Sequence, residues 1–301
     1  MPAYGCLPKV EDPRDYTFTP PETYTGAFVD LSPGFPQPPY DQGQLGSCVS
    51  NGTAAVIDYA RAKQGLKPLD PPSRLFIYYV GRVITGQPIN QDTGLQVRDG
   101  LTVANKYGAP PETDWPYNIA EFAVQPPTTA YADAVLDEAV KFGAVTAANI
   151  DATIASGYPV LLGFPVYSSF ESTQTAQTGV MPVPNKATEQ ILGGHCVVFC
   201  STPKDGSLIP GGVPGVQYRL TRNSWGHDGT WGIPTQPGYF WFPVSEVTDG
   251  DASDFWVLTT VSDPNAPTPS PTPAPSPLDA VIASMRKAWA AFDAWLKARG
   301  V

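Results

Sequence analysis

The sequence feature that most constrains the fold is a short segment that ends at Cys48. Gln42 precedes this cysteine by six residues through a glycine-rich turn, and apolar residues recur at helical spacing from Val49 to Ala60. A helix that begins at Cys48 exposes its thiol to the positive end of the helix dipole, which favours the thiolate. The side-chain amide of Gln42 can then donate to an oxyanion formed beside the sulfur. We therefore predict a nucleophilic cysteine at the start of a central helix that ends near Gly65.

Two later segments supply the other groups that a cysteine nucleophile needs. His195 stands at the head of an apolar, β-branched run, and Asn223 precedes Trp225 in an Asn-Ser-Trp-Gly sequence. The only other histidine, His227, lies in a glycine-rich loop just after Asn223. It is too close to that asparagine along the chain to approach Cys48 from an opposing strand while the asparagine orients it. We therefore expect His195 to be the base and His227 to be a loop residue.

Each of these segments has an ordinary explanation when it is considered alone. A glutamine in a turn is usually solvated, a buried cysteine is usually a small apolar side chain, and Asn-Ser-Trp-Gly is often only a turn. Their joint order along the chain, with a helix or a strand predicted at each step, favours a catalytic set.

This joint order resembles that of the papain-like cysteine proteases, in particular their bacterial and viral members. The resemblance covers nearly all of residues 1–262 and includes the segments Asp12–Tyr16, Val29–Leu31, Pro72–Tyr79 and Gly157–Phe164. Three positions depart from the family pattern. Leu45 stands where plant and lysosomal members carry a disulfide cysteine, Val49 replaces an aromatic residue and Cys196 replaces a small one. None of these departures removes a catalytic group.

The resemblance implies an α+β, papain-like two-lobe fold, in which a helical lobe and an antiparallel β lobe meet at the active-site cleft. It implies that Cys48 attacks the scissile carbonyl to form a thioester, that His195 protonates the leaving amine and that Asn223 orients the imidazole. It also implies that Gln42 and the backbone N–H of Cys48 form the oxyanion hole and that Trp225 shields the bond between histidine and asparagine from water. No metal ion or organic cofactor is required.

Gly94 is a further candidate, for substrate binding. Asp92-Thr93-Gly94 resembles the loop whose glycine backbone pairs with the substrate in this family, although the usual neighbouring cysteine and second glycine are missing. A plain turn glycine ahead of a helix explains Gly94 equally well.

The pattern of apolar residues divides the catalytic domain, residues 29–262, into a helical part and a strand-rich part at about residue 125. Besides the central helix, helices are predicted at Ser73–Ile84, at Gln96–Lys106 and near Ala130–Phe142. Strands are predicted at Pro159–Val166, His195–Ser201, Val216–Arg222, Gly238–Phe242 and Phe255–Thr260.

The cysteines do not suggest a disulfide framework once Cys48 is reserved as the nucleophile. Cys196 and Cys200 are four residues apart on a predicted strand, a span of roughly 13 Å that exceeds disulfide reach. We expect both to be core thiols, and Cys6 has no assigned role.

Composition and charge narrow the class and the location of the protein. The chain has 301 residues, of which 42% are hydrophobic, enough for a sizeable core. Its net charge of −10 argues against binding to nucleic acid through a basic patch. No secretory signal peptide or transmembrane stretch is recognisable, so we expect synthesis in the cytoplasm. Association with a virion and export by a signal-independent route are both compatible with this expectation.

The two ends of the chain differ from the catalytic domain. Residues 1–28 are proline-rich and form either a strap on the catalytic domain or a short segment that occludes the cleft. Residues 263–277 form a proline-rich linker. Residues 278–301 are predicted to form an amphipathic docking helix, with Ser276 and Asp279 as its N-terminal cap. Its apolar seam comprises Leu278, Ile282, Met285, Trp289, Phe292 and Leu296.

This seam predicts that residues 278–300 bind a protein partner or a second copy of the chain. The alternative is that the helix packs back onto its own catalytic domain. For the whole chain we expect a cysteine endopeptidase that acts on a protein or peptide substrate. Two alternatives remain: a papain-like acyl transferase or ligase, and a binding module whose cleft is permanently covered.

Overall fold

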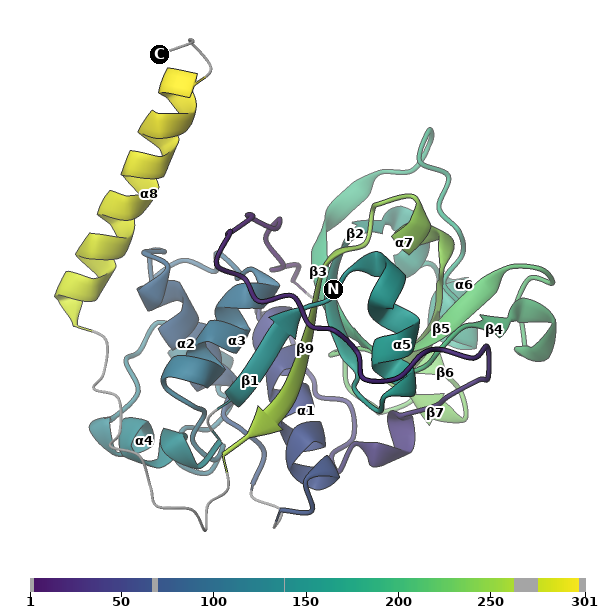
Figure 1. The fold of residues 1–301 in the computed structure, drawn as a ribbon, viewed down its shortest axis with the longest axis horizontal. Helices are drawn as coiled ribbons and strands as arrows, with labels where there is room; N and C mark the ends of the chain where they lie inside the picture. Colours follow the sequence, from purple (N-terminus) through teal and green to yellow (C-terminus); the bar gives the residue numbers. More distant parts are fainter. Residues whose placement is uncertain (1–2, 67–69, 138, 263–275, 298–301) are drawn as a thin grey trace.

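A mainly helical lobe occupies the first half of the described chain. The computed structural model describes residues 3–66, 70–137, 139–262 and 276–297. Helix α1 (Cys48–Lys63) lies between the two lobes and is buried along most of its length, because it contacts α2 (Arg74–Ile84) and α3 (Val97–Lys106) on one side and the sheet on the other (Figure 1). The bounds of the three helices agree with the sequence prediction to within two residues.

The helix predicted near Ala130–Phe142 is wrong in its second half. The chain forms α4 (Thr128–Asp133), a 3₁₀ turn at Ala134–Asp137 and then strand β1 (Ala139–Ala144). Phe142 pairs opposite Leu258 of strand β9 (Ser253–Val261), and its ring lies 5.8 Å from that of Trp256. The hydrogen bonds and ring contacts of the sheet thus outweigh the local helical pattern.

The second lobe is built on an antiparallel sheet with the strand order β1-β9-β2-β3-β5-β4, in which β8 also pairs with β5. These strands are β2 (Val160–Tyr167), β3 (Ile191–Phe199), β4 (Lys204–Asp205), β5 (Gln217–Arg222) and β8 (Tyr239–Pro243). A separate ribbon joins β6 (Gly232–Ile233) and β7 (Gln236–Pro237). The short helices are α5 (Ile150–Ala155), α6 (Thr173–Thr178) and α7 (Ser245–Thr248).

Strand β3 begins four residues earlier than the predicted start at His195. Gly193 and Ile191 pair with Val166 and Tyr167 of β2, so the strand extends toward the cleft ahead of the histidine. His195 therefore lies inside a paired strand, which fixes the direction of its side chain.

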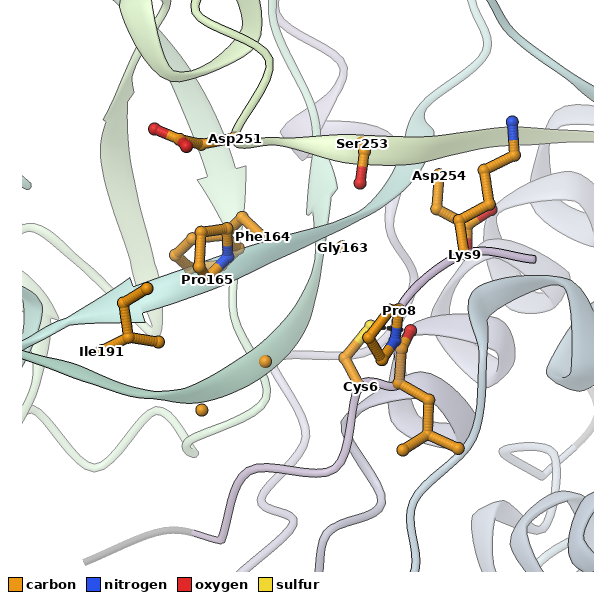
Figure 2. Close-up of a pocket in the computed structure, with 13 residues that line it drawn as sticks. Cys6, Pro8, Lys9, Gly163, Phe164, Pro165, Ile191, Asp251, Ser253 and Asp254 are labelled. Atoms are coloured by element: carbon orange, nitrogen blue, oxygen red, sulfur yellow. Dashed lines mark hydrogen bonds between the residues drawn. The ribbon is translucent and has the colours of Figure 1, made fainter. Parts of the chain in front are cut away.

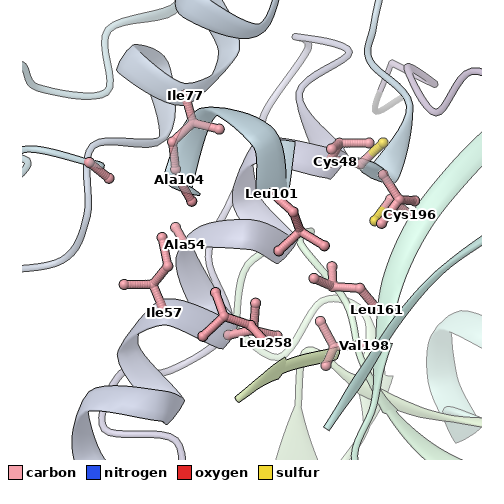
Figure 3. Packing of buried hydrophobic residues seen from close by; sticks show 14 of the residues in the cluster. Cys48, Ala54, Ile57, Ile77, Leu101, Ala104, Leu161, Cys196, Val198 and Leu258 are labelled. Carbon is pink, nitrogen blue, oxygen red and sulfur yellow. The ribbon is translucent and has the colours of Figure 1, made fainter. Parts of the chain in front are cut away.

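Two apolar cores stabilise the fold, one between the lobes and one within the β lobe. The first lies between α1 and the sheet, where Ile57, Leu101, Leu161 and Leu258 are fully buried or nearly so (Figure 3). The second fills the β lobe with aromatic rings, namely Phe164, Phe170, Phe199, Phe240 and Phe242. Cys196 and Cys200 are buried free thiols, as predicted.

The N-terminal segment, residues 3–28, is called the strap below. It runs along the β lobe and adds backbone hydrogen bonds to its edge (Figure 1). Phe18 N donates to Ala144 O at 2.8 Å, Ala144 N donates to Tyr16 O at 2.8 Å, and Val29 N, just past the strap, donates to Thr202 Oγ1 at 2.8 Å. The strap is therefore anchored well beyond the few residues that reach the cleft.

Helix α8 (Pro277–Lys297) projects from the body of the molecule (Figure 1). Asp279 N donates to Ser276 Oγ at 3.2 Å and Ser276 N donates to Asp279 Oδ2 at 2.7 Å, so the predicted cap is present. Ser284 lies against Gly86, just after α2, while Leu278, Val281 and Met285 are more than half exposed. Among the described helices none is long and apolar enough to span a bilayer. The predicted linker lies almost entirely outside the described residues.

Candidate active site

Cys48 is the first residue of α1 and is fully buried. The turn before it depends on Gly43, whose φ of +58° is a conformation that favours glycine. Ser47 O accepts the N–H of Asn51 at 3.0 Å and so starts the helix. The sulfur thus lies at the N-terminal end of a helix, where the dipole favours a negative charge.

Gln42 is also fully buried, and three hydrogen bonds fix its side-chain amide. Its Nε2 donates to Leu45 O at 3.0 Å and to Ala3 O of the strap at 2.8 Å. Its Oε1 accepts the hydroxyl of Ser224 at 2.6 Å. The amide nitrogen is therefore turned toward a carbonyl oxygen in the cleft. Sequence reasoning missed Ser224, and its only signal was its place next to Asn223.

His195 of β3 and Asn223, which follows β5, are brought together by the pairing of these two strands. His195 Nε2 lies 2.7 Å from Asn223 Oδ1, which also accepts the N–H of Ser224 at 2.8 Å. Because this oxygen is an acceptor, Nε2 carries the proton. Nδ1 has no hydrogen-bond partner among the described residues, so it is free to exchange a proton.

Trp225 covers the imidazole. Its ring centroid lies 5.0 Å from that of His195, with the two planes tilted by 32°. His227 lies in the exposed loop, where its Nδ1 is 3.1 Å from Pro39 O. The structure thus places His195 beside Asn223 in the interior and His227 at the surface.

The strap passes directly over this constellation. Gly5 O accepts the N–H of Leu95 at 2.8 Å, Leu7 N donates to Leu95 O at 2.9 Å, and Cys6 N donates to Gly194 O at 3.0 Å. The strap thereby bridges the two lobes with a parallel pairing to Leu95.

Two glycines permit this close approach. A Cβ on Gly94, whose φ is +73°, would lie 2.1 Å from Gly5 O, and a Cβ on Gly5 would lie 1.8 Å from Gly46 O. Gly94 therefore lies in the cleft against an extended peptide segment, which in the described chain is the strap itself.

Burial under the strap keeps both reactive groups neutral. It raises the pKa of the Cys48 thiol to about 12, and the nearby Cys6 adds to this effect. The backbone N–H groups of Cys196, Gly5 and Val49 act in the opposite direction. Burial also lowers the pKa of His195 to about 4, although the hydrogen bond that its Nε2–H donates to Asn223 Oδ1 acts in the opposite direction. While the strap covers them, Cys48 is therefore a neutral thiol and His195 a neutral imidazole.

Two cavities flank the strap within the cleft. One, of about 420 Å³, extends from Cys6 and Pro8 to Phe164 and Asp254 (Figure 2). The other, of about 430 Å³, lies on the side of Trp225 and includes Glu171.

Comparison with known proteins agrees with this arrangement. The chain is 35% identical over 235 residues to an uncharacterized peptidase C1-like protein of Acanthamoeba polyphaga mimivirus, a match that covers 74% of this chain and 70% of that protein. Xylellain, a cysteine protease from Xylella fastidiosa, superposes with a TM-score of 0.74 and 32% identity over 87% of this chain and 97% of its own.

More distant structures share the fold. A procathepsin B from Trypanosoma congolense has a TM-score of 0.63 at 15% identity and is covered to 86%. No family model matches the chain. The predicted α+β two-lobe architecture and the predicted resemblance are both confirmed. The chain belongs to the papain-like family of cysteine peptidases.

Proposed function

We propose that this chain is an endopeptidase that hydrolyses peptide bonds with Cys48, His195 and Asn223 as its triad. Cys48 attacks the scissile carbonyl as a thiolate and forms a thioester, while His195 passes its proton to the leaving amine. Water then attacks the thioester, and the carboxylate product leaves. Gln42 Nε2 and the N–H of Cys48 stabilise the oxyanion in both steps.

The observation that carries this proposal is the orientation of two buried side chains. His195 Nε2 is 2.7 Å from Asn223 Oδ1, which leaves Nδ1 as the nitrogen available to the thiol. Gln42 Nε2 donates to a carbonyl oxygen, Ala3 O, at 2.8 Å. A base with one free nitrogen and an amide that already holds a carbonyl oxygen are the groups that acyl transfer to sulfur requires.

The same contacts support a latent form of the enzyme. The strap presents the N–H of Gly5 to the thiol of Cys48, where hydrolysis would need a carbonyl carbon. It also pairs with Leu95 through two hydrogen bonds and so excludes another peptide from that position. Of the two alternatives for residues 1–28, we therefore favour the occluding segment.

The test uses the full-length chain and the variant Gly5→Leu. A side chain at Gly5 meets Gly46 O and must lift the strap, so we expect faster hydrolysis of a fluorogenic peptide and faster labelling of Cys48 by an epoxysuccinyl inhibitor. Val10→Leu, at an exposed strap position, is the matched control and should behave as the unmodified chain. Cys48→Ala in the Gly5→Leu background should abolish both signals.

Failure of the proposal has two distinguishable forms. If Gly5→Leu labels at Cys48 but releases no hydrolysis product, an added amine nucleophile and mass spectrometry of the products would reveal acyl transfer. If neither labelling nor turnover occurs in a folded variant, the chain acts as an occluded binding module.

We further propose that α8 tethers the enzyme to a protein partner or to a second copy of the chain. Leu278 is 63% exposed, Val281 52% and Met285 67%, although Ser284 touches the catalytic domain at Gly86. Several exposed large apolar side chains on one helix favour a partner that covers them. A tethered peptidase meets nearby substrate at high local concentration.

A further inference from the structure

The side of the cleft next to Trp225 carries an acidic and aromatic cavity. Its volume is about 430 Å³, and its walls include the carboxylates of Asp41 and Glu171 and the indoles of Trp225 and Trp231. No basic side chain is among the described residues that line it. The N–H groups of both indoles lack a hydrogen-bond partner within the described chain.

One side chain of the strap already uses this site. The hydroxyl of Tyr4 donates to Glu171 Oε1, and burial together with this hydrogen bond raises the pKa of the phenol well above its usual range. The ring centroid of Tyr4 lies 6.3 Å from that of Trp225 and 6.0 Å from that of His195. Glu171 therefore accepts a hydrogen bond from the hydroxyl of Tyr4, and the ring of Tyr4 lies beside the imidazole of His195.

The chemistry of the proposed reaction identifies which substrate residue faces Glu171. The leaving amine belongs to the residue after the scissile bond, and it must lie beside His195 to take the proton. Tyr4 is the strap residue whose ring packs against His195 and Trp225. The substrate residue that supplies the leaving amine thus occupies the position of Tyr4.

We propose that Glu171 makes the enzyme select substrates with lysine or arginine immediately after the scissile bond; this inference rests on the proposed endopeptidase activity. A tyrosine offers Glu171 one neutral donor, whereas an ammonium or guanidinium group offers a charge-assisted hydrogen bond. A cation also gains from the face of an adjacent indole. Tyr4 contacts Glu171 and Trp225, which both line the cavity. Its volume of about 430 Å³ has room for the longer side chain, and Asp41 adds a second carboxylate to its wall.

The experiment uses the full-length chain carrying Gly5→Leu, so that the strap is lifted. Three quenched peptides differ only in the residue after the scissile bond, which is arginine, glutamine or glutamate, and mass spectrometry verifies the cleaved bond. We expect kcat/KM to decrease in that order, with arginine preferred over glutamine by roughly ten- to a hundredfold, the range for a hydrogen bond to a charged group.

Two variants assign this preference to Glu171. Glu171→Gln should reduce the ratio of arginine to glutamine to near one, and Glu171→Lys should make the glutamate peptide the better substrate. Glu22→Gln is the matched control, because it changes the net charge equally at an exposed strap position and should leave the ratio unchanged. Added salt should lower the ratio in the parent enzyme, a measurement that needs no variant of Glu171.

A ratio near one in the parent enzyme, or a preference for arginine that survives in Glu171→Gln, would overturn the inference while leaving the endopeptidase intact. If the parent hydrolyses none of the peptides and Cys48 resists the epoxysuccinyl inhibitor, the proposed function itself fails. The two failures are therefore separate observations.

Discussion

Asn223 and Ser224 are neighbours in the chain, yet each orients a different group of the proposed active site. Asn223 Oδ1 is bonded to His195, and Ser224 Oγ donates to Gln42 Oε1 at 2.6 Å. The backbone adds a third link, because Gln42 N donates to Ser224 O at 2.9 Å. One dipeptide thus aligns both the proposed base, His195, and the proposed oxyanion donor, Gln42.

This link predicts a graded effect of substitutions around Gln42. Gln42→Ala removes an oxyanion donor and should lower kcat by about 10²- to 10³-fold. Ser224→Ala leaves the donor in place but frees its orientation, so we expect a smaller loss, about tenfold or less, mainly in kcat. Ser224→Thr keeps the hydroxyl and serves as the control in steady-state assays. Equal rates for Ser224→Ala and the parent would show that Gln42 holds its orientation without this bond.

Substitution of the two histidines is expected to have opposite effects on peptide hydrolysis. His195→Ala should abolish hydrolysis, because no other described side chain is bonded to Asn223 Oδ1. His227→Ala should retain most of the activity, since its ring is hydrogen-bonded to Pro39 O at the surface and the described structure shows no bond from it to Asn223. Peptide hydrolysis with circular dichroism as a check on folding measures both. A folded His227→Ala enzyme without activity would reverse the assignment of the base.

At the scale of elements, the position of the strap is expected to depend on pH, because the strap covers the titratable side chain of His195. His195 is fully buried while residues 3–7 cover it, and its pKa falls from 6.5 to about 4. The closed form therefore binds fewer protons than an open form with an ordinary imidazole. Between pH 6.5 and about 4, each unit of decrease in pH therefore raises the equilibrium constant for opening of the strap by up to about tenfold.

We predict that the strap opens as the pH falls from 7 to 4.5. Hydrogen exchange of residues 3–10, corrected for intrinsic rates, measures this opening in a Cys48→Ala background that prevents self-cleavage. Replacing His195 with Gln removes the titrating group and should remove most of the pH dependence. If the dependence persists unchanged in His195→Gln, another group controls the strap.

The sequence predicts some of these elements better than others, for physical reasons. The helix from Cys48 and the strand with His195 were predictable because burial on one side imposes a local pattern of apolar residues. The strand at residues 139–144 was not, because it is stabilised by pairing with β9, more than a hundred residues later. The course of residues 3–7 depends in the same way on partners at Gly46, Leu95 and Gly194.

At the scale of the whole molecule, catalysis and association are expected to be separable. Deleting residues 264–301 should leave hydrolysis of a small peptide unchanged, because the described contacts of α8 with α2 and Gly86 involve no residue of the proposed triad. The same deletion should abolish self-association or partner binding, measured by light scattering and by co-purification. Met285→Glu in the full chain should reproduce the loss. Unfolding or loss of small-peptide activity on deletion would mean that the helix belongs to the catalytic domain.

The strap is part of the same chain as the cleft that it covers. Loss of the strap by cleavage of the chain would therefore be irreversible. While the chain is intact, the local concentration of the covering residues is of millimolar order, and dilution cannot release them. Val10 is 62% exposed, whereas Tyr16 and Phe18 are hydrogen-bonded to Ala144 of β1. A single cut between these two points would turn the covering residues into a short free peptide that diffuses away, and no folding step could restore them. Activation by this route would be one-way.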